Sequence, residues 1–359
     1  MQAILLVGGK GTRLRPLTIS TPKPMLPVAG VPFTAHQIAR ARDAGVTRIV
    51  LGTSYRAEVF SQYFGDGADV GVELVYRTEE EPLGTGGGIR YAAEALTCGA
   101  EEPVLVFNGD VLSGVDLRHL VAEHERTDAA VTLHLTRVSD PRAFGLVPTD
   151  ADGRVTGFLE KPTSDEEIVT DQINAGCYVF RRDVIDRIPD REVVSVERQT
   201  FPGLLEVGER LTGVVDDGYW LDLGTPLSFA RGSADLVRGL VDSSAVPGPP
   251  GPFLVLPGAT VDASAELTGG TVVADGCIVG AGARVAGSVL MPGAVVGPGA
   301  QVTGSVLAQG VTVGERACLT GVVAAEDVHI GADVELVEGA RLWPGAHLAD
   351  GSIRFSSDH

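Results

Sequence analysis

The sequence predicts an α/β domain with a doubly wound, mixed and mostly parallel sheet, followed by a second domain that forms a parallel β-helix. From residue 1 to about residue 235, short aliphatic runs alternate with longer amphipathic runs, which is typical of strands alternating with helices. From Leu256 onward, a hydrophobic residue recurs every six positions. A proline- and glycine-rich stretch separates the two patterns. We therefore expect domains at 1–240 and 254–359, joined by a linker at 241–253.

The first domain is expected to contain strands at 3–7, 48–52, 73–76, 104–108, 130–136, 157–160 and 175–180. The segment 33–44 is predicted to be a helix that ends at Gly45, and a second helix should follow Ser54. In a doubly wound layout, ligands bind at the carboxyl ends of the strands. Functional residues should therefore lie at that edge of the sheet.

The second domain shows a regular repeat. Its first hydrophobic positions are Val261, Leu267, Val273, Val279 and Val285, and three units of 17 residues follow at 286–302, 303–319 and 320–336. Each unit is expected to form one triangular coil with small or aliphatic residues inside and glycines at the corners. The pattern resembles the left-handed parallel β-helix of hexapeptide-repeat proteins.

Composition excludes several classes of protein. The net charge of −19 argues against binding to nucleic acids or acidic membranes, since a polyanion would repel the chain as a whole. The four separated cysteines indicate neither a zinc site nor a disulfide framework. No basic region precedes the first apolar run, and the uncharged stretch 286–314 contains prolines that would break a membrane helix. We expect a cytoplasmic protein with reduced thiols.

The strongest sign of function is a glycine-rich segment near the start of the chain. An aliphatic run ends in the glycines Gly8, Gly9 and Gly11, and three cations follow, namely Arg13, Arg15 and Lys23. Bare backbone in such a loop can surround a phosphate, and prolines on both sides of Lys23 stiffen the cationic part. The spacing matches neither the P-loop nor the dinucleotide fingerprint. A tight turn with basic surface residues is the alternative interpretation.

A second glycine-rich segment, Glu79–Gly88, precedes a helix expected to begin near Ile89. Bare backbone at Gly84, Gly86 and Gly87 would permit the close approach of a flat base or a ribose. A simple loop with a helix cap is the alternative.

Asp110 is a candidate metal ligand, because it follows the aliphatic strand expected at 104–108. A second acidic residue, Asp222, lies much further along the chain in the segment Trp220–Gly224. A carboxylate is a suitable hard oxygen ligand for Mg²⁺, although Asp110 could instead cap the next helix. The two residues are too distant in sequence for spacing to bring them together.

Polar residues suited to a sugar phosphate lie between these aspartates. Glu160 and Lys161 end one expected strand, and Asn174 precedes another. Glu and Asn can form paired hydrogen bonds with sugar hydroxyls, while Lys suits a phosphate. A surface ion pair and a turn asparagine are the alternatives.

In their order along the chain, these segments resemble the signatures of the sugar-nucleotide pyrophosphorylases, which make NDP-sugars from an NTP and a sugar 1-phosphate. The matching segments are G-G-x-G-T-R-L-x-P-L-T, P-K-P-M-L-P, E-E-x-P-L-G-T, G-D, F-L-E-K-P, N-A-G and W-x-D-L-G-T-P. The resemblance covers nearly the whole chain, and the β-helix has the length seen in mannose-1-phosphate guanylyltransferases. It implies GTP and mannose 1-phosphate as substrates and Mg²⁺ as cofactor. We also expect a homo-oligomer assembled through the β-helix domain, since exposed prism faces and open coil ends tend to be covered by another subunit.

The resemblance also implies roles for individual residues. Nucleotide binding would fall to Leu6, Gly8, Gly9, Gly11, Thr12, Arg13, Lys23, Pro82, Gly84, Thr85, Asn108 and Asp110. The sugar phosphate would be bound by Gly145, Glu160, Lys161, Asn174 and Gly176. Arg13, Lys23 and Lys161 would be catalytic, and Asp110 and Asp222 would hold the metal.

Three alternatives stay open. Within the class, glucose 1-phosphate or a cyclitol phosphate could be used with UTP, dTTP or ATP, and the base pocket stays open because Gly86-Gly87-Gly88 stands where family members often show T-A-G-P. The chain could also be a non-catalytic regulatory subunit that binds GDP-mannose. A regulatory subunit could lose the charged residues Arg13, Lys23, Asp110 and Asp222, but this chain retains them. Acyl transfer on the β-helix is the third, with His329 and His347 as its candidate bases.

Overall fold

The structure, a computed structural model, describes residues 1–162, 164–337 and 339–354, and its contacts divide the chain into two compact units. The first unit contains Met1–Gly9 and Gln37–Trp220. The second contains Lys10–His36 and the chain from Leu221 onward. The division does not follow the order of the sequence, because residues 10–36 pack with the C-terminal part of the chain.

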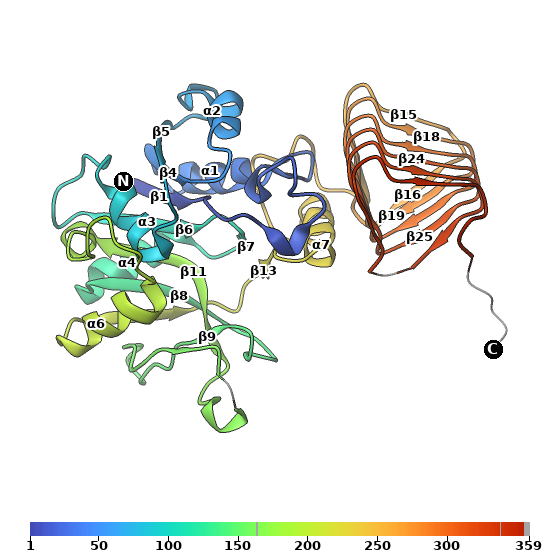
Figure 1. Cartoon of the computed structure of the whole chain (residues 1–359). Coiled ribbons are helices and arrows are strands. Elements are labelled where there is room, and N and C mark those ends of the chain that lie inside the picture. The colour runs from blue at the N-terminus through green and yellow to red at the C-terminus, as the bar shows by residue number, and fades with distance from the viewer. Residues whose placement is uncertain (163, 338, 355–359) are drawn as a thin grey trace. The chain divides into compact units, whose positions relative to one another are not determined.

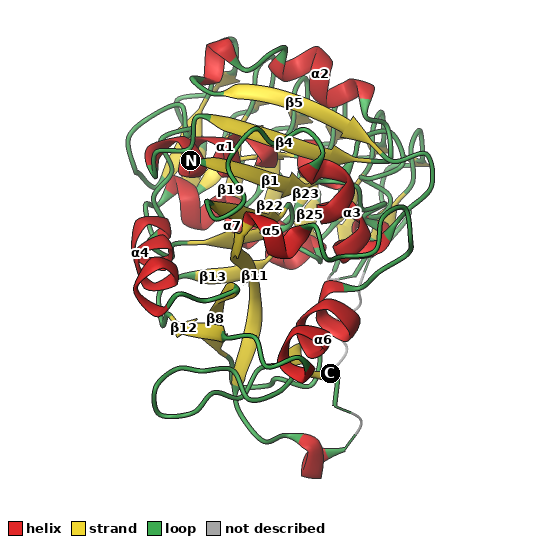
Figure 2. Ribbon diagram, turned by 90° about the vertical axis from the view of Figure 1, so that its left-hand side faces the viewer, coloured by secondary structure: helices red, strands yellow, loops and turns green. Residues whose placement is uncertain are grey.

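The first unit is built on a mixed β-sheet with the strand order β10-β9-β11-β6-β1-β4-β5, in which β8 pairs with β11 and β12 pairs with β8 (Figures 1 and 2). Strands β5, β4, β1 and β6 are parallel, and β11 runs antiparallel to both β6 and β8. The strands are β1 Gln2–Leu6, β4 Arg48–Thr53, β5 Glu73–Thr78, β6 Pro103–Asn108, β8 Val131–Arg137, β9 Gly145–Leu146, β10 Leu159–Glu160, β11 Gln172–Arg181 and β12 Leu211–Val215. The short β7 covers Val111–Ser113.

Helices cover this sheet. Those of the first unit are α2 Glu58–Phe64, α3 Gly84–Ala93, α4 Leu117–Thr127, α5 Arg182–Ile185 and α6 Phe201–Glu206, while α1 Phe33–Asp43 begins in the second unit and ends in the first. Short helical turns lie at Ala68–Val70, Asp165–Glu167 and Val196–Thr200. Helix α3 packs on β1 and β4, and α4 packs on β8. Aliphatic and aromatic residues that are almost fully buried, including Ile4, Val106 and Tyr178, form the core between these layers.

The predicted strands of this domain are confirmed, with small shifts at their ends. The expectation that a helix begins near Ile89 is wrong, because α3 begins at Gly84 and includes the glycines of the second glycine-rich segment. Glycine is a poor helix former. Gly86, Gly87 and Gly88 are nevertheless buried in this helix, so tertiary packing outweighs their low intrinsic propensity.

The non-repetitive part of the second unit consists of residues 10–36 and helix α7 Pro226–Val237. It also contains β2 Pro27–Val28, β3 Val31–Pro32 and short helical turns at Thr12–Leu14 and Lys23–Met25, and β13 Trp220–Asp222 leads into it. Helix α7 contacts both β2 and the first strands of the β-helix. The amide of Ala29 donates to the Ser233 hydroxyl at 2.9 Å, which joins these segments.

The repeat of the second domain is confirmed as a parallel β-helix, consistent with the expected left-handed form. In the described part of the chain, its faces are the sheets β14-β17-β20-β23-β26-β29, β15-β18-β21-β24-β27-β30 and β16-β19-β22-β25-β28 (Figure 1). Paired residues are 17 positions apart in the central coils, as in Ile278 with Val295, and 18 apart at both ends, as in Thr260 with Ile278. Buried valines such as Val279, Val296 and Val313 fill the interior.

The strands of the first sheet of the β-helix are Phe253–Val255, Thr271–Val273, Val289–Leu290, Val306–Leu307, Val323–Ala324 and Arg341–Leu342. Those of the second are Thr260–Val261, Ile278–Val279, Val295–Val296, Thr312–Val313, His329–Ile330 and His347–Leu348. Those of the third are Glu266–Thr268, Arg284–Ala286, Gln301–Thr303, Cys318–Thr320 and Glu335–Leu336. The β-helix begins with strand β14 at Phe253, which is the last residue of the expected linker.

Candidate functional site

The carboxyl ends of β1 and β6 lie side by side in the first unit. Leu6 is paired with Asn108, and the Gly109 amide donates to the Leu6 carbonyl at 2.9 Å. A Cβ atom on Gly109 would lie 2.5 Å from that carbonyl oxygen, so only glycine fits here. This turn presents Asp110, which is half-buried, at the edge where ligands bind in such sheets.

The alternative role of Asp110 as a helix cap is wrong. The residues that follow it form strand β7, and helix α4 begins later, at Leu117. Its cap is Asp116, whose carboxylate accepts hydrogen bonds from the amides of Arg118 at 2.9 Å and His119 at 3.2 Å. Asp110 therefore has no helix-capping task.

The beginning of β11 reaches the same edge, because this strand runs antiparallel to β6. Gly176 has a φ of +77°, and a Cβ atom there would lie 2.9 Å from Asn108 Nδ2. Asn174 donates through Nδ2 to the Tyr178 hydroxyl at 2.8 Å and accepts from the Gly176 amide at 3.1 Å. Burial raises the pKa of Tyr178, so the phenol stays protonated. The structure thus brings Asn108, Asn174 and Gly176 together around a tyrosine that our sequence analysis did not assign to the site.

Gly145 and Glu160 face each other across the strand pair β9–β10. A Cβ atom on Gly145 would lie 2.7 Å from Glu160 Oε2, so glycine leaves room for this carboxylate. Lys161 has a φ of +54°, and its Nζ lies 4.0 Å from Glu160 Oε1. The Lys161 side chain is 62% exposed, so this ion pair is a weak one.

The glycines of α3 pack tightly against another segment of the protein. Cβ atoms on Gly84 and Gly87 would lie 2.6 Å from the Val194 carbonyl oxygen and 2.4 Å from the Glu192 carbonyl oxygen, respectively. The Gly86 amide donates to the Val194 carbonyl at 2.8 Å. The close approach that these glycines permit is therefore at least partly to the protein's own backbone.

Thr85 also holds this neighbouring segment. Its hydroxyl donates to Glu197 Oε2 at 3.0 Å and accepts from the Val196 amide at 2.9 Å. The hydroxyl of Thr85 is thus engaged within the protein.

The residues before this helix differ in exposure. Pro82 is exposed. Burial raises the pKa of the nearby Glu79 carboxyl, which accepts a hydrogen bond from the Leu83 amide at 3.3 Å.

The two glycines that end the first strand differ in their surroundings. The Gly8 carbonyl accepts a hydrogen bond from the Ser54 hydroxyl, and a Cβ atom on Gly8 would lie 2.8 Å from that hydroxyl oxygen. Gly9 is exposed, and a Cβ atom there would meet nothing within 4 Å among the described residues. Of these two positions, packing within the protein requires glycine at residue 8 and leaves residue 9 open.

In the second unit, residues 10–27 form a segment that we call the cationic loop. Gly11, which precedes the helical turn that begins at Thr12, has a φ of +60°, and a Cβ atom there would lie 2.7 Å from Lys23 Cβ. Its carbonyl accepts from the Thr18 hydroxyl at 2.9 Å. Gly11 therefore lets the stem of Lys23 pack against the start of the loop.

Arg13 and Lys23 of the cationic loop meet Asp222. Arg13 Nη2 lies 3.4 Å from Asp222 Oδ2, and Lys23 Nζ lies 3.8 Å from Asp222 Oδ1. Lys23 is buried, with 10% of its side chain exposed, whereas the Arg13 side chain is 64% exposed. A Cβ atom on Gly224 would lie 2.4 Å from Arg13 Nη2, so glycine leaves room for the guanidinium.

Asp222 Oδ1 is buried and accepts no hydrogen bond from any residue that the structure describes. The Lys23 ammonium is the cation beside this oxygen, but at 3.8 Å it lies beyond hydrogen-bond distance. A carboxylate oxygen that accepts no hydrogen bond has a coordination position that suits a hard metal ion. Gly224 was not assigned by our sequence analysis, although its place two residues after Asp222 could have drawn attention to it.

The histidines of the β-helix stack on each other. The ring centroids of His329 and His347 are 4.5 Å apart, and Thr312 Oγ1 lies 2.7 Å from His329 Nδ1. Both histidines are exposed on the same sheet. Among the described residues, all four cysteines are free, and no helix combines the length and apolar character needed to cross a bilayer.

Comparison with known families decides the classification of this fold and site. Residues 2–239 match the family described as nucleotidyl transferase. The chain belongs to the nucleotidyl transferase family. Residues 250–351 match a second family, described as GMPPB C-terminal domain, so this nucleotidyl transferase combines both parts in one chain.

This nucleotidyl transferase is similar in sequence to mannose-1-phosphate guanylyltransferases of other organisms. A mannose-1-phosphate guanylyltransferase of Mycobacterium tuberculosis is 56% identical over 359 residues, which cover 100% of this chain and 98% of the relative. The catalytic subunit beta of a mannose-1-phosphate guanylyltransferase of Drosophila pseudoobscura is 38% identical over 72% of this chain and 70% of that relative.

Solved structures also resemble this nucleotidyl transferase. HddC from Yersinia pseudotuberculosis is 27% identical with a TM-score of 0.55, covering 65% of this chain and 97% of HddC. The same protein complexed with GMP-PN gives a TM-score of 0.54 at 27% identity and the same coverage. A putative glucose-1-phosphate thymidylyltransferase from Bacillus anthracis, 24% identical with a TM-score of 0.59, shares the fold over 65% of this chain and 94% of its own.

Proposed function

We propose that this chain transfers GMP from GTP to the phosphate of α-D-mannose 1-phosphate, giving GDP-mannose and pyrophosphate. The observation that carries the proposal is the 56% identity, over the full length, to a protein named for this activity. The chain also retains every charged residue that the reaction is expected to need, namely Arg13, Lys23, Asp110, Lys161 and Asp222.

The reaction needs positioning and charge neutralisation more than acid–base chemistry. An oxygen of the sugar phosphate attacks the α-phosphorus of GTP in line, a new P–O bond forms, and the bond from the α-phosphorus to the bridging oxygen breaks as pyrophosphate leaves. A phosphate monoester dianion is already a competent nucleophile, so no general base is required. The side chains expected to accelerate the reaction are therefore the cationic ones.

Arg13 and Lys23 are proposed to neutralise the triphosphate and the leaving pyrophosphate. Their shared contact with Asp222 supports this role, because it places both cations beside the carboxylate that is proposed to hold the metal. Lys161 is proposed to hold the sugar phosphate. Its 62% exposed side chain and 4.0 Å distance to Glu160 Oε1 leave it available for an anion.

Asp110 and Asp222 are proposed to hold Mg²⁺. When bound, the ion would neutralise charge on the phosphates. The buried Oδ1 of Asp222, which has no hydrogen-bond partner among the described residues, supports its role, and Asp110 is half-buried after a turn that only glycine permits.

The remaining predicted residues are proposed to bind the rest of the substrates. Backbone at Gly8, Gly9, Gly11 and Thr12 would contact the phosphates, and Leu6, Pro82, Gly84, Thr85 and Asn108 would contact the nucleoside. Gly145, Glu160, Asn174 and Gly176 would orient the sugar ring. The hydrogen bonds that Asn174 makes with Tyr178 and Gly176 support this, because they fix the amide before a sugar arrives.

A homo-oligomer assembled through the β-helix domain and a cytoplasmic location are also part of the proposal. Several large apolar residues of the β-helix are exposed, including Phe253, Ile278 and Trp343, and such residues are often covered by another subunit. Light scattering on the full chain and on a Trp343→Ser variant would measure the mass. A monomer at micromolar concentration would contradict the oligomer.

The activity is tested by pyrophosphate release from the purified full chain with Mg²⁺. The assay combines GTP, ATP, UTP, CTP and dTTP in turn with mannose, glucose, galactose and glucosamine 1-phosphates. Release that peaks with GTP and mannose 1-phosphate is the expected result. A peak elsewhere would replace the substrates, and no release in any combination would favour a regulatory subunit.

A further inference from the structure

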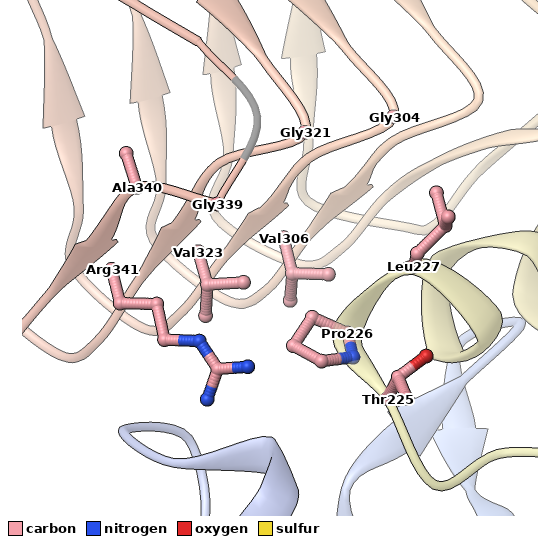
Figure 3. Close-up of a pocket in the computed structure, with 10 residues that line it drawn as sticks. All are labelled: Thr225, Pro226, Leu227, Gly304, Val306, Gly321, Val323, Gly339, Ala340 and Arg341. Carbon is pink, nitrogen blue, oxygen red and sulfur yellow. The ribbon is translucent and has the colours of Figure 1, made fainter.

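The β-helix contacts the cationic loop through Arg341, the first residue of β29. Arg341 Nη1 donates to the carbonyl oxygens of Arg13 at 2.9 Å and Arg15 at 2.7 Å. These carbonyls belong to the helical turn Thr12–Leu14 and the residue that ends it. Figure 3 shows the Arg341 guanidinium extending away from its strand.

The carbonyls of Arg13 and Arg15 accept hydrogen bonds from outside the loop, whereas their neighbours accept from amides within it. Backbone amides within the loop donate to the carbonyls of Gly11, Thr12, Leu14 and Pro16. The carbonyls of Arg13 and Arg15 alternate with this set and accept from Arg341 instead. A guanidinium nitrogen with two N–H groups can serve both acceptors at once. Arg341 therefore supplies hydrogen bonds to these two carbonyls from outside the loop.

A second contact joins the same parts of the chain. The Ser20 hydroxyl donates to Glu326 Oε1, and Glu326 lies in the β-helix before β27. The cationic loop is thus held by the β-helix on both sides of Pro16.

The backbone held by Arg341 carries a side chain with little support of its own. The Arg13 side chain is 64% exposed, and its Nη2 lies 3.4 Å from Asp222 Oδ2. An exposed arginine has many rotamers, so the position of its guanidinium depends strongly on where its backbone is fixed.

We propose that Arg341 is a positioning residue for nucleotidyl transfer, which fixes the backbone of Arg13 and so places the Arg13 guanidinium. The β-helix then contributes to the rate of the reaction as well as to assembly. This inference rests on the proposed function, since it assumes that Arg13 neutralises phosphate charge.

The surroundings of Arg341 separate this role from a role in folding. Arg341 lines a cavity of about 220 Å³ between the start of α7 and the glycine corners of the β-helix, together with Pro226, Leu227, Val306 and Val323 (Figure 3). The residue is exposed rather than packed in the core. Its removal should expose two carbonyls to water without creating a buried void, so the fold should persist.

The test compares Arg341→Ala, Arg341→Lys, Arg13→Ala and the double variant Arg13→Ala/Arg341→Ala in the full chain. Arg284→Ala is the matched control, because Arg284 is also an exposed arginine of the β-helix, with 65% of its side chain exposed, and its ion pair is with Glu266. We expect kcat to fall about 10- to 100-fold in Arg341→Ala, as for a small misplacement of a catalytic group. Its melting temperature should match that of Arg284→Ala.

Two further readouts are specific to positioning. Arg341→Lys, which keeps a cationic donor, should recover part of the lost kcat. The double variant should be no slower than Arg13→Ala alone, because Arg341 acts through Arg13.

Three outcomes would contradict either the role proposed for Arg341 or the role proposed for Arg13. Wild-type kcat in Arg341→Ala together with a large loss in Arg13→Ala would overturn the inference and leave the proposed function intact. Additive losses in the double variant would also overturn it, since Arg341 would then act independently of Arg13. Near-normal turnover in Arg13→Ala would overturn the proposed role of Arg13 itself.

Discussion

The guanidinium of Arg13 lies against the backbone of Gly224, where a Cβ atom would come within 2.4 Å of its Nη2. The same nitrogen is 3.4 Å from Asp222 Oδ2. Residues more than 200 positions apart in the sequence thus form one arrangement, in which a missing side chain makes room for a cation beside a carboxylate. This arrangement leads to the first prediction.

Gly224→Ala should displace the Arg13 guanidinium and lower kcat by about 100-fold, because small misplacements of catalytic groups are costly. Stability should change little, since the Arg13 side chain is exposed and can move. Steady-state kinetics with GTP and mannose 1-phosphate would measure the effect. Gly203→Ala is the control, as a Cβ atom there meets nothing within 4 Å among the described residues. Equal kcat values for the two variants would contradict the prediction.

Asp222→Asn should lower turnover by about 100-fold or more and weaken the binding of Mn²⁺ used as a probe for Mg²⁺. The substitution removes the charge but keeps the size of the side chain. Electron paramagnetic resonance of Mn²⁺ with GTP would measure binding without turnover. Asp69→Asn, which changes an exposed aspartate, should leave both values unchanged. Unaltered Mn²⁺ binding in Asp222→Asn would remove Asp222 from the metal site.

Gly87→Ala and Gly86→Ala should differ although they are neighbours. A Cβ atom on Gly87 would lie 2.4 Å from the backbone oxygen of Glu192, whereas one on Gly86 would first meet Val194 Cγ1 at 2.9 Å. A side chain can shift more readily than a backbone. We expect a raised KM for GTP in Gly87→Ala and a nearly unchanged KM in Gly86→Ala. The reverse order would show that packing against residues 192–194 does not determine the shape of this segment.

Gly11→Ala should destabilise the cationic loop. The left-handed φ of +60° costs about 1–3 kcal/mol for a residue with a side chain, and the Cβ atom would lie 2.7 Å from Lys23 Cβ. Because the stem of Lys23 must then move, kcat should fall as well. Urea unfolding and kinetics would measure the two effects. Gly9→Ala, at an open position, should change the free energy of unfolding much less.

Stability should fall as the pH is lowered from about 6.5 to about 4. Burial lowers the pKa of His36, His124 and His134 from 6.5 to about 4. In this range the unfolded chain binds protons that the folded chain does not, so each histidine lowers the free energy of unfolding by about 1.4 kcal/mol per pH unit. Below pH 4 both states are protonated, and the loss from these groups ends.

Urea unfolding at several pH values would measure this dependence. His124→Leu should reduce the slope between pH 6.5 and 4, since one buried histidine is removed. A slope equal to that of the unmodified chain would show that His124 is protonated equally in the folded and unfolded states.

Most of the first domain's architecture could be predicted because its signals are local. Aliphatic runs predict β1 and β6, and glycines after them predict the turns that present Gly8 and Asp110. The helix α3 was misjudged at its start, since glycine disfavours helices in isolation and only the packing of Val194 and Glu192 explains its glycines there. Tyr178 was missed for a similar reason, because a buried aromatic residue in a strand does not reveal the hydrogen bond that it makes.

The sequence by itself determined the α/β order and the 17-residue coils, which follow from a periodicity that acts over a few residues of chain. Its resemblance to a family pointed to the charged residues of the candidate site. Only the tertiary structure decided that Asp222 lies between Arg13 and Lys23, that Gly224 leaves room for a guanidinium, and that Arg341 holds the cationic loop. Such contacts join residues that are more than 190 positions apart, and they arise from the packing of whole elements. No local pattern encodes them.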